Sequence, residues 1–118
     1  MRDSPTVALV GCGHWGRHIL RDLKILGCRV PVVARSSESV ARAEEGQADA
    51  IVEGTAELPE LDGVVVATPT ATHAEVVEAL LAFGVPIFVE KPLTSDPGSA
   101  RRIAALAGDR VFVMDKWR

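Results

Sequence analysis

Apolar residues along this chain follow two kinds of pattern. Short continuous apolar runs, such as residues 63–67, are typical of parallel strands that are buried on both faces. Between these runs, apolar residues recur every three or four positions, as Trp15, Ile19 and Leu23 do, which is the spacing of an amphipathic helix. The pattern predicts strands at 6–10, 29–34, 50–52, 63–67, 86–89 and 111–114, and helices at 14–26, 37–45, 73–83 and 97–107.

The first predicted strand joins the first predicted helix through three glycines with the spacing Gly-x-Gly-x-x-Gly. Gly11 lets the chain turn off the strand, Gly13 lets the backbone approach a pyrophosphate, and Gly16 lets the helix lie close to the sheet. The helix directs its free N–H groups and its positive dipole end at the same place, where an anion binds without a basic side chain. The stretch predicts a dinucleotide site. The alternative is a strand-turn-helix whose glycines serve packing alone.

The regular alternation of strand and helix predicts an α/β domain. Right-handed crossovers and a glycine loop after the first strand favour a Rossmann fold, a doubly wound parallel sheet of six strands in the order 3-2-1-4-5-6. We expect its ligand cleft beyond the carboxyl ends of the first and fourth strands. We also expect a single domain over residues 1–118, because 118 residues of this composition suit one compact core.

Composition and charge exclude several classes of partner. The net charge of −3, with both signs scattered, provides no basic surface for nucleic acid or an anionic membrane. No apolar run approaches the length of a signal core or a membrane span, so we expect a cytoplasmic protein. Cys12 and Cys28 lack paired metal-ligand spacing, so we expect free, reduced thiols and predict no metal site.

The residues after the second predicted strand bear on the choice of nucleotide. A Rossmann unit that prefers NAD usually carries an acid about 20 residues past its glycine loop, on the ribose hydroxyls. Here that place holds no acid, and Arg35 and Ser36 offer a cation and a hydroxyl for a 2′-phosphate. The sequence therefore favours NADP over NAD. The alternative is that Arg35 stacks on adenine or faces water and that either nucleotide is accepted.

The first helix carries basic and aromatic side chains besides its apolar stripe. The basic residues of its outer face are Arg17, Arg21 and Lys24. We expect that face to be solvated rather than to steer phosphates. We expect His14 in the loop near the pyrophosphate, His18 on the surface and Trp15 in the core. His14 and Trp15, as members of the loop, are also candidate cofactor-binding residues.

The turns at the carboxyl edge of the predicted sheet carry a family resemblance. They comprise the glycine loop, the run 64–70 (Val-Val-Val-Ala-Thr-Pro-Thr) with His73 after it, and above all Glu90-Lys91-Pro92 after the fifth strand. With these marks the chain resembles the Gfo/Idh/MocA oxidoreductases. The resemblance covers nearly all of this chain but only the nucleotide-binding half of a typical member, so we expect the family's substrate domain to be absent. Residues 114–118 depart from the family, whose members more often show a glycine early in that segment.

The resemblance implies roles for individual residues. In the family the lysine of the tripeptide approaches the substrate hydroxyl and the nicotinamide, which makes Lys91 the candidate catalytic residue, with Glu90 beside it at the cofactor. The family's Thr-Pro segment lines the cofactor, and its counterparts here are Thr68, Pro69 and Thr70. From the residues alone, the alternative for Lys91 is a solvated cation or an ion-pair partner of Glu90.

Two functions remain from the sequence. The first is the cofactor-binding domain of an NAD(P)-dependent oxidoreductase that acts on a sugar, cyclitol, nucleotide sugar or related hydroxy compound; this chain alone is then expected to be inactive. The second is a non-catalytic dinucleotide-binding or sensing module. A short-chain dehydrogenase is excluded, because its chemistry uses a tyrosine and the chain has none. His73 is open between contact with the cofactor ribose and a surface imidazole, and oligomerisation is also left open.

Overall fold

Strand and helix alternate along the part of the chain that this computed structural model describes, which comprises residues 4–68, 73–90, 98, 101, 105 and 110–114. The strands are β1 (Val7–Val10), β2 (Pro31–Val33), β3 (Ala50–Val52), β4 (Gly63–Val66), β5 (Ile87–Glu90) and β6 (Val111–Met114). The helices are α1 (His14–Ile25), α2 (Ser37–Glu45) and α3 (His73–Leu80), with short 3-10 helices η1 (Thr55–Glu57) and η3 (Leu81–Phe83).

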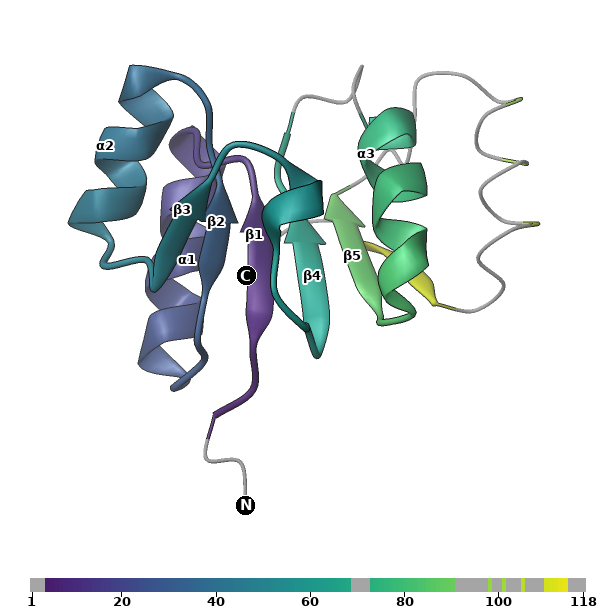
Figure 1. Ribbon diagram of the computed structural model, residues 1–118, viewed down its shortest axis with the longest axis horizontal. Helices are drawn as coiled ribbons and strands as arrows, with labels where there is room; N and C mark the ends of the chain where they lie inside the picture. Colours follow the sequence, from purple (N-terminus) through teal and green to yellow (C-terminus); the bar gives the residue numbers. More distant parts are fainter. Residues whose placement is uncertain are drawn as a thin grey trace.

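The six strands form one parallel sheet in the order β3-β2-β1-β4-β5-β6, which confirms the predicted Rossmann topology (Figure 1). β1 lies at the centre, where Leu9 is in register with Val32 of β2 and with Val65 of β4. Because all strand pairs are parallel, their carboxyl ends meet at one edge. The glycine loop after β1 and the amino end of α1 therefore lie at the edge where ligands bind in such sheets.

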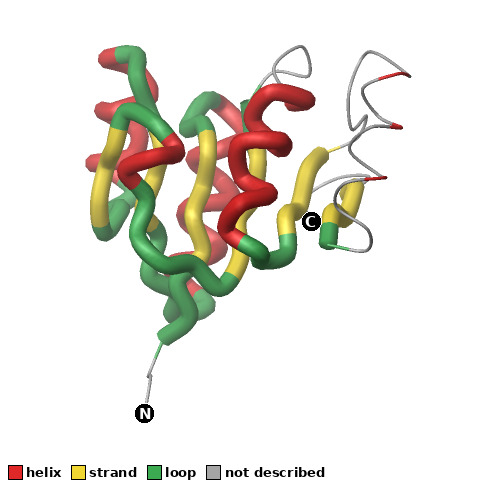
Figure 2. Tube along the Cα trace, turned by 45° about the vertical axis from the view of Figure 1, so that its right-hand side comes forward, coloured by secondary structure: helices red, strands yellow, loops and turns green. Residues whose placement is uncertain are grey.

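Helices cover both faces of the sheet, which forms the middle of three layers (Figures 1 and 2). Leu9 and Val65 face α1 and α2, and pack in a cluster with Ile19, Leu20 and Leu23 of α1. The alternate positions, such as Val64 and Val66, face the opposite layer, which contains α3. Strands buried on both sides account for the continuous apolar runs in the sequence.

Two aspartates tie strands together at the amino edge of the sheet. The Thr6 N–H donates to Asp62 Oδ2 over 2.8 Å, and the Asp62 N–H donates to the Thr6 carbonyl over 2.7 Å. Asp49 makes the same reciprocal pair with Val30, through Oδ2 at 2.7 Å and through its N–H at 2.9 Å. Each carboxylate thus accepts the backbone N–H of the residue just before a strand.

The predicted element bounds hold with small shifts. α1 ends at Ile25, one residue before the predicted end of this helix, and Leu26 is its C-cap with 73% of its surface exposed. Gly27 follows in the left-handed region with φ +89°, a conformation that suits glycine after a helix. Arg29, predicted within the second strand, makes an isolated parallel bridge to Thr6 before β2 begins.

The second half of the chain also follows the prediction where it is described. β5 begins one residue later than predicted, and α3 passes into η3 before Gly84, which has φ +68°. The predicted helix at 97–107 lies largely outside the described residues. Among the described helices, none has the length and apolar character needed to cross a membrane.

Candidate functional site: the glycine loop and its neighbours

Gly11 is required by both backbone conformation and close packing. Its φ is +92°, a region that residues with a side chain rarely adopt. A Cβ on Gly11 would lie 2.9 Å from Thr68 Cγ2 and 3.2 Å from the carbonyl of Ala67. The residues after β4 therefore occupy the space where a side chain of the loop would stand.

Gly16 lets the first turn of α1 lie directly against the loop. A Cβ there would lie 2.5 Å from the Gly11 carbonyl oxygen, which is backbone and cannot give way cheaply. It would also approach the Ala67 Cβ to 3.8 Å. The predicted role of Gly16 in close helix packing is thus met, although its nearest neighbour is the loop itself.

Gly13 differs from the other two loop glycines. Apart from its chain neighbours, no described residue has an atom within 4 Å of a Cβ built on it, and its φ of −86° is open to any residue. Neither its φ nor packing against the described residues requires a glycine there. Among those residues, the position of a Cβ on Gly13 is open.

α1 and α2 differ in the groups that face the first N–H groups at their amino ends. α2 begins after Ser36, whose Oγ accepts the Ser39 N–H over 3.1 Å, and Glu38 stands in its first turn. α1 begins after Gly13, with no side-chain cap and no acidic residue in its first turn. Among the described residues no side chain caps the first N–H groups of α1, and groups of this kind bind anions well.

Arg35 lies two residues beyond β2, at the same carboxyl edge. Its side chain is exposed, and Nε donates to the Glu53 carbonyl oxygen over 2.8 Å, which ties the end of β2 to the residue after β3. The sequence carries no signal for this partner. The hydroxyl of Ser36 is engaged as the cap of α2 and also donates to Ser39 Oγ at 2.9 Å.

Three aromatic rings meet on the first turns of α1. The centroids of His14 and His18 are 5.6 Å apart, and Trp15 lies 6.4 Å from His14 and 6.2 Å from His18. Trp15 is 52% exposed, so its predicted place in the core is wrong: the first turn of α1 stands at the sheet edge, where no layer covers it. Partial desolvation and the charges of Arg17 and Arg21 lower the pKa of His18, which is neutral at pH 7.

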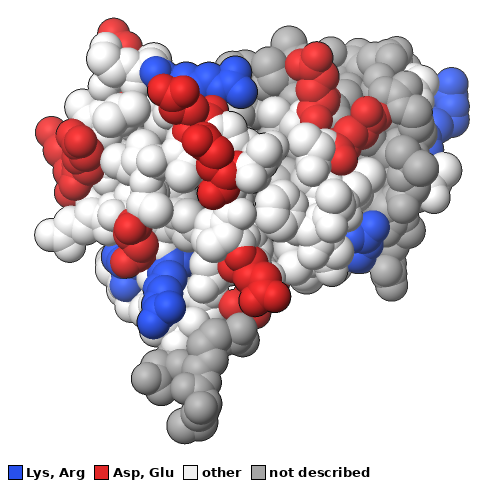
Figure 3. All heavy atoms as spheres, in the orientation of Figure 1, with Lys and Arg blue, Asp and Glu red and all other residues white. Residues whose placement is uncertain are grey.

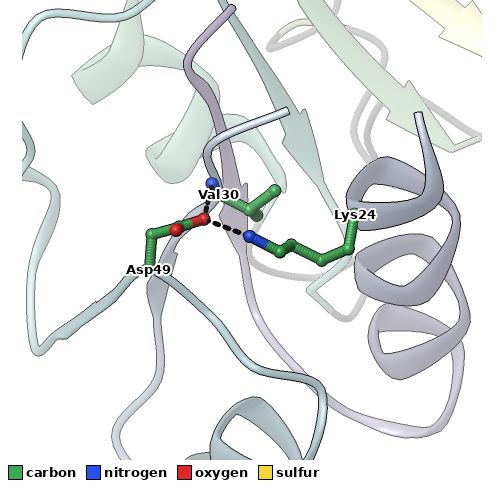
Figure 4. A network of polar contacts seen from close by, with 3 residues as sticks. All are labelled: Lys24, Val30 and Asp49. Carbon is green, nitrogen blue, oxygen red and sulfur yellow. Dashed lines mark hydrogen bonds and ion pairs between the residues drawn. The ribbon is translucent and has the colours of Figure 1, made fainter. Parts of the chain in front are cut away.

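The basic residues of α1 are only partly solvated. Arg17 and Arg21 are exposed as predicted, and Arg21 Nε lies 3.3 Å from Asp22 Oδ1. Lys24 departs from the prediction, because its Nζ lies 2.7 Å from Asp49 Oδ2 (Figure 4). Acidic and basic side chains are interspersed over the described part of the face in Figure 3, as the scattered charge of the sequence predicts.

The cysteines and histidines of the described residues do not form a metal centre. Cys12 and Cys28 are free thiols, as predicted. Burial raises the pKa of Cys12, which packs in the apolar cluster beneath α1 and stays protonated. Within those residues, no group of three His, Cys, Asp or Glu side chains is placed to hold a metal ion.

The remaining candidates follow β4 and β5. His73 begins α3 and Glu90 ends β5, in register with Met114 of β6. Both lie at the carboxyl edge, as predicted. Pro69, Thr70 and Lys91 lie outside the described residues, so their predicted roles rest on the sequence.

Comparison with known proteins agrees with this architecture. A family model described as an oxidoreductase family with an NAD-binding Rossmann fold matches residues 6–113. The chain is 36% identical over 104 residues to an inositol 2-dehydrogenase from Streptomyces avermitilis, covering 82% of this chain and 30% of that protein. It is 32% identical over 107 residues to a UDP-N-acetylglucosamine 3-dehydrogenase from Acidithiobacillus ferrooxidans, covering 90% and 34%.

Solved structures show the same likeness. GenD2 from gentamicin A biosynthesis, in complex with NAD, superposes with a TM-score of 0.78 at 31% identity. The superposition covers 96% of this chain and 35% of GenD2. The chain thus spans about a third of the length of the relatives it matches.

Proposed function

Because this chain belongs to the Gfo/Idh/MocA oxidoreductase family, whose members have an NAD-binding Rossmann fold, we propose that it holds the dinucleotide of a dehydrogenase in the glycine loop. Membership of the family was expected from the motifs at the carboxyl edge. The observation that carries the proposal is that no other described residue lies within 4 Å of a Cβ on Gly13, beside the two tightly packed glycines of the same loop.

The loop fits a pyrophosphate in shape and in charge. Gly11 and Gly16 bring the turn and the first turn of α1 into contact, and no other described residue fills the place of a Cβ on Gly13. The first N–H groups of α1 have no side-chain cap, so phosphate oxygens can accept from them. Cys12, buried behind the loop, contributes packing rather than a contact with the ligand.

The reaction we propose is the oxidation or reduction of a hydroxy compound such as a sugar, cyclitol or nucleotide sugar. Two similar proteins are named as dehydrogenases of inositol and of UDP-N-acetylglucosamine, which supports this substrate class. A bound nicotinamide supplies the hydride acceptor or donor. We assign to Lys91 the task of holding or moving the proton of the substrate hydroxyl, on the family motif Glu90-Lys91-Pro92.

We further propose that the preferred nucleotide is NADP. Arg35 is exposed at the carboxyl end of β2, and its Nε bond to the Glu53 carbonyl holds the guanidinium at this edge. Its remaining N–H groups can then bind a 2′-phosphate as a fork. Residues 1–118 act in this proposal as one cofactor unit, and substrate contacts outside it complete the reaction cleft.

The proposal is tested by dinucleotide binding to this chain, measured by calorimetry. Gly13→Val should abolish binding of NADP and NAD and leave the circular dichroism spectrum and the unfolding midpoint unchanged, because a Cβ at this position meets no atom of the other described residues within 4 Å. Gly27→Asn serves as the matched glycine control, since it ends α1 at the opposite edge and Asn tolerates its left-handed backbone. A Gly13→Val variant that binds as tightly as the parent would contradict a phosphate site in this loop.

A further inference from the structure

The turn after β1 lies against Ala67 and Thr68, the two residues that follow β4. The Ala67 N–H donates to the Val10 carbonyl over 2.9 Å, which brings the ends of these two strands together. Thr68 comes next, and its Cγ2 methyl lies 2.9 Å from the position of a Cβ on Gly11. The methyl group therefore fills the place that the side chain of any other residue at position 11 would need.

Gly11 makes contacts on three sides in this arrangement. Its N–H donates to the Val33 carbonyl over 2.9 Å, which binds the turn to β2. Its carbonyl oxygen lies 2.5 Å from the position of a Cβ on Gly16, so α1 closes the second side. On the third side, where a Cβ on Gly11 would stand, the nearest described atom is the Thr68 methyl carbon, and the next two belong to the backbone of Ala67.

We infer that Thr68 is a positioning residue of the dinucleotide site, whose methyl group holds Gly11 in the conformation that cradles the pyrophosphate. The inference rests on the proposed function, and it goes beyond the family role of this segment, in which the side chain lines the cofactor directly. A left-handed glycine has many accessible conformations. Packing against the methyl selects one of them before the ligand arrives, which lowers the ordering cost of binding.

Two substitutions separate the methyl group of Thr68 from its hydroxyl. Thr68→Ser keeps the hydroxyl and removes the methyl. Thr68→Val keeps the methyl and replaces the hydroxyl by a second methyl group. We expect Thr68→Ser to weaken binding of NADP and NAD about fivefold, the effect of one lost methyl-sized contact, and Thr68→Val to weaken it less than Thr68→Ser does. The reverse order would overturn the inference, because it would assign the role to the hydroxyl.

A second measurement needs no nucleotide. The Gly11 amide, bonded to Val33, should exchange with solvent about fivefold faster in Thr68→Ser than in the parent and at the parent rate in Thr68→Val. The Ala34 amide, bonded to the Val52 carbonyl at 3.0 Å on the same edge, is the internal control and should not change. Equal Gly11 exchange in the parent and Thr68→Ser would overturn the inference. A parent chain that binds neither NADP nor NAD would contradict the proposed function instead, and the exchange rates would still decide the contact.

Discussion

Lys24 Nζ lies 2.7 Å from Asp49 Oδ2, so the last turn of α1 is joined to the residue before β3 (Figure 4). The same oxygen accepts the Val30 N–H over 2.7 Å. Partial burial opposes ionisation of Asp49, but the hydrogen bonds from Lys24 and Val30 outweigh it, and the pKa of this carboxyl lies below its usual value. One side chain thus links a helix and two strands at the edge opposite the glycine loop.

The Asp49 contacts predict an acid-dependent part of the stability. Because the folded-state pKa lies below the unfolded value of about 3.9, the stabilisation is present above about pH 4 and is lost as the pH falls through the folded pKa. Asp49→Asn should lower the free energy of unfolding by about 1 kcal/mol at pH 7. Between pH 6 and pH 3, the free energy of unfolding should fall less in Asp49→Asn than in the parent. Urea unfolding at both pH values measures this, with Lys24→Met as the variant that keeps the Val30 bond. Equal acid losses in Asp49→Asn and the parent would rule out the linkage.

The contact of Arg35 with Glu53 leads to a prediction about nucleotide choice. Charge-assisted hydrogen bonds are worth about 1.5–3 kcal/mol, so Arg35→Ala should weaken NADP about tenfold or more and leave NAD nearly unchanged. Arg35→Lys keeps the charge but loses the paired N–H groups of the guanidinium. Its affinity for NADP should lie between those of the parent and Arg35→Ala. Titration of both nucleotides decides the question. An equal loss for NADP and NAD would support stacking of Arg35 on adenine instead.

Gly46 and Gln47, at the end of α2, predict opposite effects on stability. Gly46 has φ −81° and is small because a Cβ there would lie 2.5 Å from Leu20 Cδ2 of α1. Gln47 takes the left-handed position, with φ +63°. Gly46→Ala should therefore lower the free energy of unfolding by about 1–2 kcal/mol. Gln47→Gly should raise it by about 0.5 kcal/mol, because glycine adopts the left-handed conformation without strain. Thermal unfolding measures both, and stabilisation by Gly46→Ala would show that Leu20 repacks freely.

The proposed role of Lys91 predicts a separation between binding and turnover. This chain alone should bind a dinucleotide but turn over no sugar or cyclitol, because hydride transfer needs the substrate oriented close to the nicotinamide. In the longest product of its gene, Lys91→Ala should reduce kcat by about 100-fold or more while the Kd for the nucleotide stays within about twofold. Steady-state kinetics and calorimetry provide the two numbers. Full activity in Lys91→Ala would remove the family role from this residue.

The sequence by itself determined the order of the elements and the topology of the sheet. Apolar runs and helical spacings are local properties, and the crossover rule leaves few ways to connect six alternating strands. The spacing of Gly11, Gly13 and Gly16 likewise located the loop, because each glycine acts within a single strand-turn-helix unit.

Tertiary structure decided what lies against those elements. The partners of Gly11, Arg35 and Lys24 are Thr68, Glu53 and Asp49, which stand 18 to 57 positions away in the chain. Helical periodicity could not show that Trp15 stands past the sheet edge, and a glycine at a helix end did not reveal that Gln47 takes the left-handed turn. These features depend on how separate elements pack, because a side chain's contacts are set by the neighbours that the fold brings to it and not by its own position in a pattern.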